Sequence, residues 1–189
     1  MRVCDCRRHG IQPSRRCFLI GAASVAVVAG FPAGRALARA VREPARTEDE
    51  KFMRLALAEA AKGDFPFGTV IVIDGEVAAT GRNLGKTNGD PTAHGEMTAI
   101  RAFVAKRRAS DLRAATLYTT GEPCPMCMSA IIWCGVKRVV YAASIAELSA
   151  RIGQIEIPSA TVAEATPFET VAITGGVLAA DALALFPKP

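Results

Sequence analysis

The spacing of apolar residues in the first half of the chain predicts a helix, a β-hairpin and a second helix. The first helix opens at Thr47-Glu-Asp-Glu50, which has the pattern of a capping box, and Gly63 ends it. Two β-branched runs follow, and the Asp74-Gly75 pair between them is typical of a hairpin turn. A loop rich in glycine and asparagine then leads to Asp90-Pro91, which has the chemistry of a helix start. The expected elements are a helix at 47–62, strands at 67–73 and 77–81, a loop at 83–90 and a helix at 90–107.

Strand and helix patterns alternate in the second half of the chain. The run ATLYTT at 115–120 has the pattern of a buried strand, Pro125 opens a helix after it, and Gly135 closes that helix after Trp133. Strands that alternate with helices after one opening hairpin predict an α/β fold with a mixed central sheet and helices on both faces. The other expected elements are a strand at 137–142, a helix at 144–151, a strand at 171–174 and a helix at 177–186.

Residues 1–38 have the features of an export signal. A twin-arginine pair in Ser14-Arg-Arg-Cys-Phe-Leu19 precedes an apolar run that ends near Phe31, and Ala36-Leu-Ala38 matches a cleavage pattern. The run is shorter than the roughly 20 apolar residues that span a bilayer. We therefore expect a cleaved signal at 1–38 that engages the twin-arginine export machinery and sends the protein to the periplasm. An uncleaved anchor is the main alternative, and an unused signal would leave the protein in the cytoplasm. We expect a short linker at 39–46 and a single domain at 47–189.

Removal of residues 1–38 changes the charge of the protein. Taking six arginines and one aspartate from the 23 basic and 18 acidic residues of the chain leaves 17 of each. The predicted mature protein is formally neutral, which argues against a nucleic-acid partner. The basic run Lys106-Arg107-Arg108 is explained by the dipole of the helix that it ends.

Two predicted helix openings carry the candidate chemistry. His94 lies at the first, with Glu96 two residues later, and it is the only histidine beyond residue 38. Cys124 and Cys127 lie at the second, three residues apart, so both sulfurs face the same side of a first helical turn. Free backbone amides and the positive end of the helix dipole favour thiolates there. Turns between strands and helices emerge along one edge of such a sheet, so the two openings are expected to face each other.

One imidazole and two thiolates fill three positions of a zinc tetrahedron and leave the fourth for water. Zinc lowers the pKa of that water towards about 7, and the resulting hydroxide is a nucleophile. Glu96 is placed to carry the proton to departing ammonia. These parts suit hydrolytic attack on the amidine-type carbon of a cyclic base, and H-x-E with P-C-x-x-C is the signature of the zinc nucleobase deaminases.

Two other functions remain open from the residues. Cys124 and Cys127 at a helix start could form the active site of an exported thiol–disulfide oxidoreductase. Such an enzyme would not use His94 or Glu96, and its motif is expected on the first strand-to-helix turn. The chain could also be a zinc-stabilised binding protein that has lost activity. Cys134 reads as a buried thiol on the same helix.

Four segments resemble the guanine deaminase and tRNA adenosine deaminase branch of the cytidine deaminase-like superfamily. The resemblance covers roughly residues 47–145. It implies a three-layer α/β/α sandwich with one zinc ion on His94, Cys124 and Cys127 and with Glu96 as proton shuttle. The segments are PFGTVIV at 66–72, GRN at 81–83, DPTAHGEMTAIR at 90–101 and LYTTGEPCPMCMSAIIWCGVKRVVYAA at 117–143.

The resemblance also implies a small-molecule nucleobase or nucleoside substrate and a homodimer. By the same resemblance, Asn83 hydrogen-bonds the base, and Phe67 and Trp133 line its pocket; from the residues alone, Asn83 could equally be a turn residue and the two aromatics plain core. Trp133 favours a guanine-like substrate over tRNA. Two features depart from the family: Gly95 stands where alanine is usual, and the family segment that follows Ala143 is not recognisable here.

Overall fold

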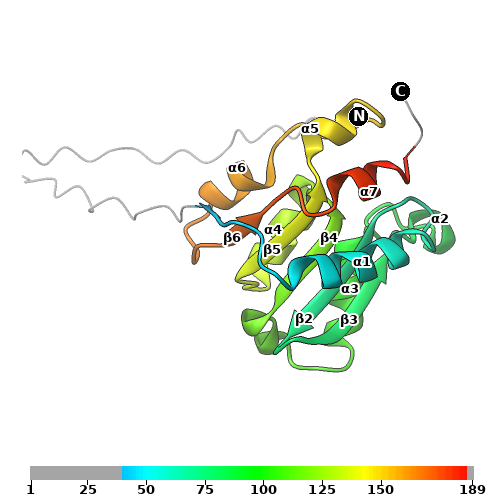
Figure 1. Cartoon of the computed structure of the whole chain (residues 1–189). Coiled ribbons are helices and arrows are strands. Elements are labelled where there is room, and N and C mark those ends of the chain that lie inside the picture. Colours follow the sequence, from blue (N-terminus) through cyan, green and yellow to red (C-terminus); the bar gives the residue numbers. More distant parts are fainter. Residues whose placement is uncertain (1–39, 187–189) are drawn as a thin grey trace, which may run out of the picture. The chain divides into compact units, whose positions relative to one another are not determined.

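A computed structural model describes residues 40–186, so the predicted signal peptide at 1–38 lies outside the described residues. Six strands form one sheet in the order β1-β6-β5-β4-β2-β3 (Figure 1). The hairpin strands β2 and β3 are antiparallel, β2 is also antiparallel to β4, and β4, β5, β6 and β1 run parallel. The sheet is therefore mixed, as expected. The strands are β1 (Val41–Arg42), β2 (Gly68–Ile73), β3 (Glu76–Arg82), β4 (Thr116–Gly121), β5 (Arg138–Ala143) and β6 (Ala172–Thr174).

Helices cover both faces of this sheet, which confirms the three-layer sandwich (Figure 1). Alternate residues of each strand enter two separate cores. Leu117 and Val139 pack with α3, α4 and α6, whereas Tyr118 and Val140 pack with α1, α5 and α7. The helices are α1 (Asp49–Ala60), α2 (Gly85–Asn88), α3 (Gly95–Val104), α4 (Pro125–Trp133), α5 (Ile145–Ser149), α6 (Ser159–Glu164) and α7 (Ala179–Leu183). In residues 40–186, no helix is long and apolar enough to cross a membrane.

Several local expectations were wrong. Residues 41–42 of the expected linker pair with β6, and the expected loop at 83–90 contains the short helix α2. The second long helix begins at Gly95 rather than at Asp90, because the Asp90 carboxylate accepts hydrogen bonds from the amide and hydroxyl of Thr92 and forms a turn instead. The sequence patterns also missed α6 and a 3-10 helix at Ala109–Ala114.

A buried ion pair ties α1 to the centre of the sheet. The capping box expected at Thr47 does not form, and the backbone amide of Arg46 donates to Asp49 instead. The Asp49 carboxylate accepts two further hydrogen bonds from Arg138 of β5, at 2.8 and 2.7 Å, and one from the Tyr118 hydroxyl at 3.0 Å. Arg138 also donates to Thr174 of β6 at 3.0 Å. This network therefore connects one helix to three neighbouring strands.

Candidate metal centre

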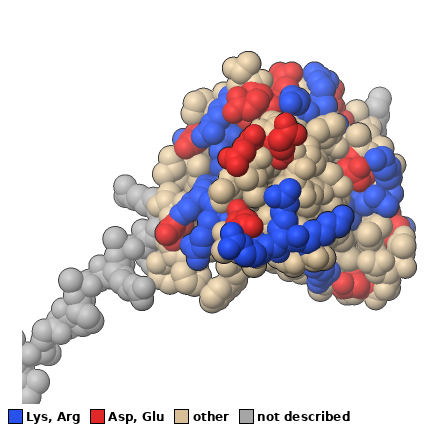
Figure 2. Space-filling model, turned by 90° about the horizontal axis from the view of Figure 1, so that it is seen from below, with Lys and Arg blue, Asp and Glu red and all other residues tan. Residues whose placement is uncertain are grey.

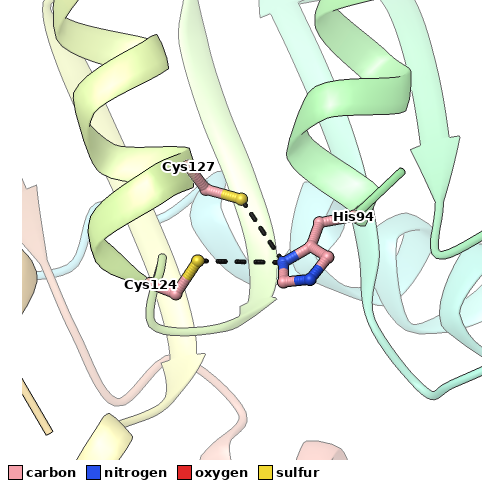
Figure 3. A group of neighbouring side chains, drawn as sticks. All are labelled: His94, Cys124 and Cys127. Atoms are coloured by element: carbon pink, nitrogen blue, oxygen red, sulfur yellow. Dashed lines mark hydrogen bonds between the residues drawn. The ribbon is translucent and has the colours of Figure 1, made fainter. Parts of the chain in front are cut away.

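His94 and Cys124 occupy equivalent positions at the starts of two helices. Each is the N-cap of its helix, α3 for His94 and α4 for Cys124, and each has extended backbone with ψ of 163° and 166°. Pro125 fills the first position of α4, where its missing N–H costs nothing. Cys127 lies in the first turn of α4 and is fully buried. The expectation that the two helix openings face each other is confirmed (Figure 3).

The three candidate ligand atoms converge on one point. His94 Nδ1 lies 3.7 Å from Cys124 Sγ and 3.6 Å from Cys127 Sγ (Figure 3). All three atoms lie within 4.8 Å of one another. Zinc–sulfur bonds of about 2.3 Å and zinc–nitrogen bonds of about 2.0 Å in a tetrahedron place nitrogen and sulfur about 3.5 Å apart. The donor set and its spacing therefore fit a zinc ion with one position left open.

Hydrogen bonds within the site favour a thiolate at Cys124. The hydrogen bond from Cys127 lowers the pKa of Cys124 to about 4, with a further contribution from His94. The same bond, together with burial, raises the pKa of Cys127. The hydrogen bond with Cys124 raises the pKa of His94. The arrangement therefore already holds one thiolate against an imidazole.

Glu96 lies on the first turn of α3 and is 4% exposed. Burial raises the pKa of Glu96, and the charge of Cys124 adds to this effect. Its Oε1 atom accepts a hydrogen bond from the Thr119 hydroxyl of β4 at 3.3 Å. The carboxyl group is thus buried beside the metal ligands and oriented by a neighbouring strand.

Asn83 and Phe67 are neighbours, and the Phe67 ring packs against the core that faces α1, α5 and α7. Asn83 is 5% exposed, its backbone amide donates to Phe67 O at 2.9 Å, and its Oδ1 accepts from the Gly85 amide at 3.1 Å. The ring of Phe67 contacts Phe186, and a Cβ atom built on Gly121 would lie 2.8 Å from it. Both residues are therefore fixed near the carboxyl end of β4, where the metal-ligand loop starts. Their contact with a base stays a prediction.

Trp133 lies away from the metal ligands of its own chain. It is the last residue of α4, whose other end carries Cys124, and the helix is about 13 Å long. Its side chain is 75% exposed and its ring lies 4.8 Å from that of Phe168. Within one chain the structure does not bring Trp133 to the site, so its place in the pocket stays a prediction.

Two features of the site were missed by sequence reasoning. Thr69 and Thr119 are fully buried threonines on strands. The Thr69 hydroxyl donates a hydrogen bond to Thr119, and the Thr119 hydroxyl donates one to Glu96. Glu122, which precedes the metal-ligand loop, accepts hydrogen bonds from Ile145 and Ser159. The signal for the threonines was present, because a polar side chain in an otherwise apolar strand needs a buried partner.

This fold and this centre define the class of zinc-binding deaminase domains. Residues 46–143 match the model of the cytidine and deoxycytidylate deaminase zinc-binding region, and the chain belongs to this family. The match covers all three candidate ligands and leaves the disulfide-exchange alternative without support. The three cysteines in the described part of the chain are free.

Alignments with individual curated relatives cover about half of this chain. It is 46% identical to guanine deaminase of Bacillus subtilis over 99 residues, which is 50% of this chain and 64% of that protein. It is 42% identical to tRNA-specific adenosine deaminase of the same species over 101 residues, 51% of this chain and 63% of that protein. A structure of guanine deaminase from Nitrosomonas europaea superposes with a TM-score of 0.61 at 28% identity, covering 87% of this chain and 96% of that one. The chain thus spans a little under two thirds of the two Bacillus relatives.

Proposed function

We propose that this protein is a zinc-dependent hydrolase of C–N bonds that releases ammonia from a free nucleobase or nucleoside, with a guanine-like base favoured. The observation that carries the proposal is the convergence of His94, Cys124 and Cys127 beside the buried carboxyl of Glu96. A structural zinc site is normally closed by four protein ligands, whereas three ligands with an open position are typical of catalysis.

The residues of the chain divide the chemistry among them. Zinc, when bound on the three ligands, supplies the Lewis acidity that makes water nucleophilic at neutral pH. Glu96 takes a proton from the attacking water and gives it to the departing amine, which a buried carboxyl with a raised pKa does well. Burial also excludes other water, because the side chain is 4% exposed.

Asn83 and Phe67 are the groups we propose to hold the base. The Oδ1 atom of Asn83 is engaged by the Gly85 amide, so the side chain presents its Nδ2 donor as the remaining hydrogen-bonding group. A donor of this kind suits the ring nitrogens and carbonyl of a purine, and an aromatic ring suits its face. The guanine deaminase relatives support a guanine-like base.

A tRNA adenosine substrate is the alternative, supported by the tRNA-specific relative. The basic run at 106–108 follows the C-terminal end of α3, about 15 Å along the helix from His94 at its N-cap. Figure 2 shows basic side chains in a band on one face, with acidic side chains among them. RNA binding rests on neutralising several phosphates. The equal numbers of basic and acidic residues at 39–189 favour a small-molecule substrate.

A panel of free bases, nucleosides and pterins, scored for ammonia release by the zinc-loaded protein, tests the proposal, with an unmodified tRNA as a further substrate. Release from guanine or a related base is expected, and Glu96→Gln should keep the zinc but abolish release. Turnover of tRNA alone would establish the alternative. A protein that holds one zinc ion and releases ammonia from nothing would be a zinc-stabilised binding protein instead.

We also propose that two copies of the chain associate through the exposed aromatic pair of Trp133 and Phe168. The two residues are 75% and 43% exposed, and they line a groove of about 500 Å³. An exposed apolar patch of this kind marks an interaction surface. Sedimentation of Trp133→Ser should show a shift from dimer to monomer. Val104→Ser, at an exposed apolar position on α3, should sediment like the wild type.

The export route stays a proposal that rests on residues 1–38. Twin-arginine export carries folded proteins, so zinc could be bound before the thiols of Cys124 and Cys127 meet an oxidising compartment. Replacement of both Arg15 and Arg16 by lysine should retain the protein in the cytoplasmic fraction. Unchanged periplasmic recovery of that variant would contradict the route.

A further inference from the structure

Three buried polar side chains from three elements form a hydrogen-bonded chain, called the line below, that ends at Glu96. The Thr69 hydroxyl of β2 donates to the Thr119 hydroxyl of β4 at 3.3 Å, and Thr119 donates to Glu96 Oε1 at 3.3 Å. Thr69 and Thr119 are each 0% exposed, and Glu96 is 4% exposed. The two threonines are direct partners in the antiparallel register of β2 and β4.

The line has a fixed direction. The Oε1 atom of Glu96 accepts the hydrogen bond from Thr119, and a threonine hydroxyl carries one proton. The Thr119 hydroxyl donates its one hydrogen bond to Glu96, so its oxygen can only accept a hydrogen bond from Thr69. Each hydroxyl proton therefore has one acceptor, and a buried hydroxyl without a partner would destabilise the protein.

Such a line does what the Glu96 side chain cannot do alone. The last torsion of a glutamate side chain has a broad energy minimum, so the plane of its carboxylate is set by its contacts. Thr119 holds Oε1 from the sheet, which fixes that plane relative to the metal ligands on α3 and α4. A proton carrier needs this orientation, since small misplacements of a catalytic group are costly.

Gly95 provides the space for the line. A Cβ atom built on Gly95 would lie 3.0 Å from the Thr69 hydroxyl oxygen and 2.9 Å from Phe67 O. The residue between His94 and Glu96 therefore has to be small for β2 to lie this close to the start of α3. The glycine that departs from the usual alanine therefore lies directly against Thr69.

We infer that Thr119 is a positioning residue that orients the Glu96 carboxylate, and that Thr69 orients Thr119. The inference rests on the proposed function only for its effect on turnover. Thr119→Val keeps the shape of the side chain and removes the donor, so we expect the kcat to fall about tenfold or more, with the KM within about twofold and the zinc content unchanged. Thr119→Ser restores the donor and should recover most of the kcat. Thr69→Val should give a smaller loss. Thr116→Val is the matched control, because alternation along β4 turns this side chain to the opposite face.

A second measurement does not depend on activity. Infrared difference spectra of the zinc-loaded protein, with Glu96→Gln to assign the band, report the carboxylate stretch of Glu96. The band should shift in Thr119→Val, return in Thr119→Ser and stay in place in Thr116→Val. An unchanged band in Thr119→Val, or a change in the KM with the kcat intact, would overturn the inference. A shifted band in a protein that deaminates nothing would overturn the proposed function and leave the positioning in place.

Discussion

The carboxylate of Glu122 holds Ser159 by two hydrogen bonds, from the backbone amide at 2.9 Å and from the hydroxyl at 2.8 Å. Its second oxygen accepts from the Ile145 amide at 2.9 Å. Glu122 comes two residues before Cys124, and both partners lie beyond residue 143, where the match to the family model ends. The segment after residue 143 is therefore hydrogen-bonded directly to the loop that carries the metal ligands.

Removal of the Glu122 carboxylate should release that part of the chain. Glu122→Ala loses three hydrogen bonds to a charged acceptor, and we expect the free energy of unfolding to fall by about 2–4 kcal/mol. Ser159→Ala removes only the hydroxyl and should cost about 1 kcal/mol. Limited proteolysis should show new cleavage between residues 145 and 158 in Glu122→Ala. Glu156→Ala, an exposed acidic position in the same segment, should behave like the wild type.

Gly95→Ala should destabilise the protein although alanine is the better helix former. Helix propensity alone predicts a gain of up to about 1 kcal/mol at this position. The added Cβ atom would lie 2.9 Å from Phe67 O, a backbone atom that cannot move without shifting β2. Urea denaturation of Gly95→Ala should therefore give a lower midpoint than the wild type. Gly153→Ala, where a Cβ meets nothing within 4 Å, is the control, and a raised midpoint in Gly95→Ala would show that β2 yields.

The Asp49–Arg138 pair should contribute acid-sensitive stability. Burial acts to raise the pKa of Asp49, but the hydrogen bonds from Arg138 and from the Arg46 amide outweigh it, and the pKa is lowered from 3.8. The unfolded chain therefore binds this proton at a higher pH than the folded protein does. Stability from Asp49 is present above about pH 4 and is lost as the pH falls below that value. Chemical denaturation from pH 6 to pH 2.5 should show this loss in the wild type.

Variants of the pair separate its charge from the rest of the fold. Asp49→Asn removes the buried counter-charge of Arg138, which then keeps Glu43, 3.5 Å from its Nε, and should cost about 3–5 kcal/mol at pH 7. The free energy of unfolding of this variant should also depend less on pH below pH 4 than that of the wild type. The double variant Asp49→Leu with Arg138→Met removes both charges and should recover much of that loss. If the free energy of unfolding falls equally between pH 6 and pH 2.5 in the wild type and the double variant, Asp49 is not the source of the acid sensitivity.

Zinc should bind in a ratio of one per chain, and of the three described cysteines only Cys124 and Cys127 should be needed for it. Cys124→Ser and Cys127→Ser should each lose zinc on dialysis, because a hydroxyl is a poor replacement for a thiolate ligand. Cys134→Ser is the matched control at the opposite end of the same helix, since this half-buried thiol lies outside the ligand group. Metal analysis and thermal unfolding with and without a chelator provide the measurement. Equal zinc in Cys124→Ser and in the wild type would remove the assigned centre.

Much of the architecture follows from local patterns. The β-branched and buried runs, with the Asp74-Gly75 turn, predicted β2 to β5, and Pro125 and Gly135 bracketed α4 where the structure has it. The metal ligands were predictable because their residue types and spacing are set by the short turns that carry them. Boundaries were less predictable: at Asp90, a side chain that bonds its own turn looks the same in sequence as one that caps a helix.

Contacts between distant residues could not be read in this way. Asp49 and Arg138 are 89 positions apart, Thr69 and Thr119 are 50 apart, and Glu122 and Ser159 are 37 apart. Each pairing depends on strand register and on how helices dock, which are properties of the packed chain. Periodicity and motif spacing act over a few residues, so they specified the elements and the chemistry of the metal centre. Sheet register and close packing then determined which side chains orient Glu96, what holds the C-terminal segment, and that Trp133 faces outward.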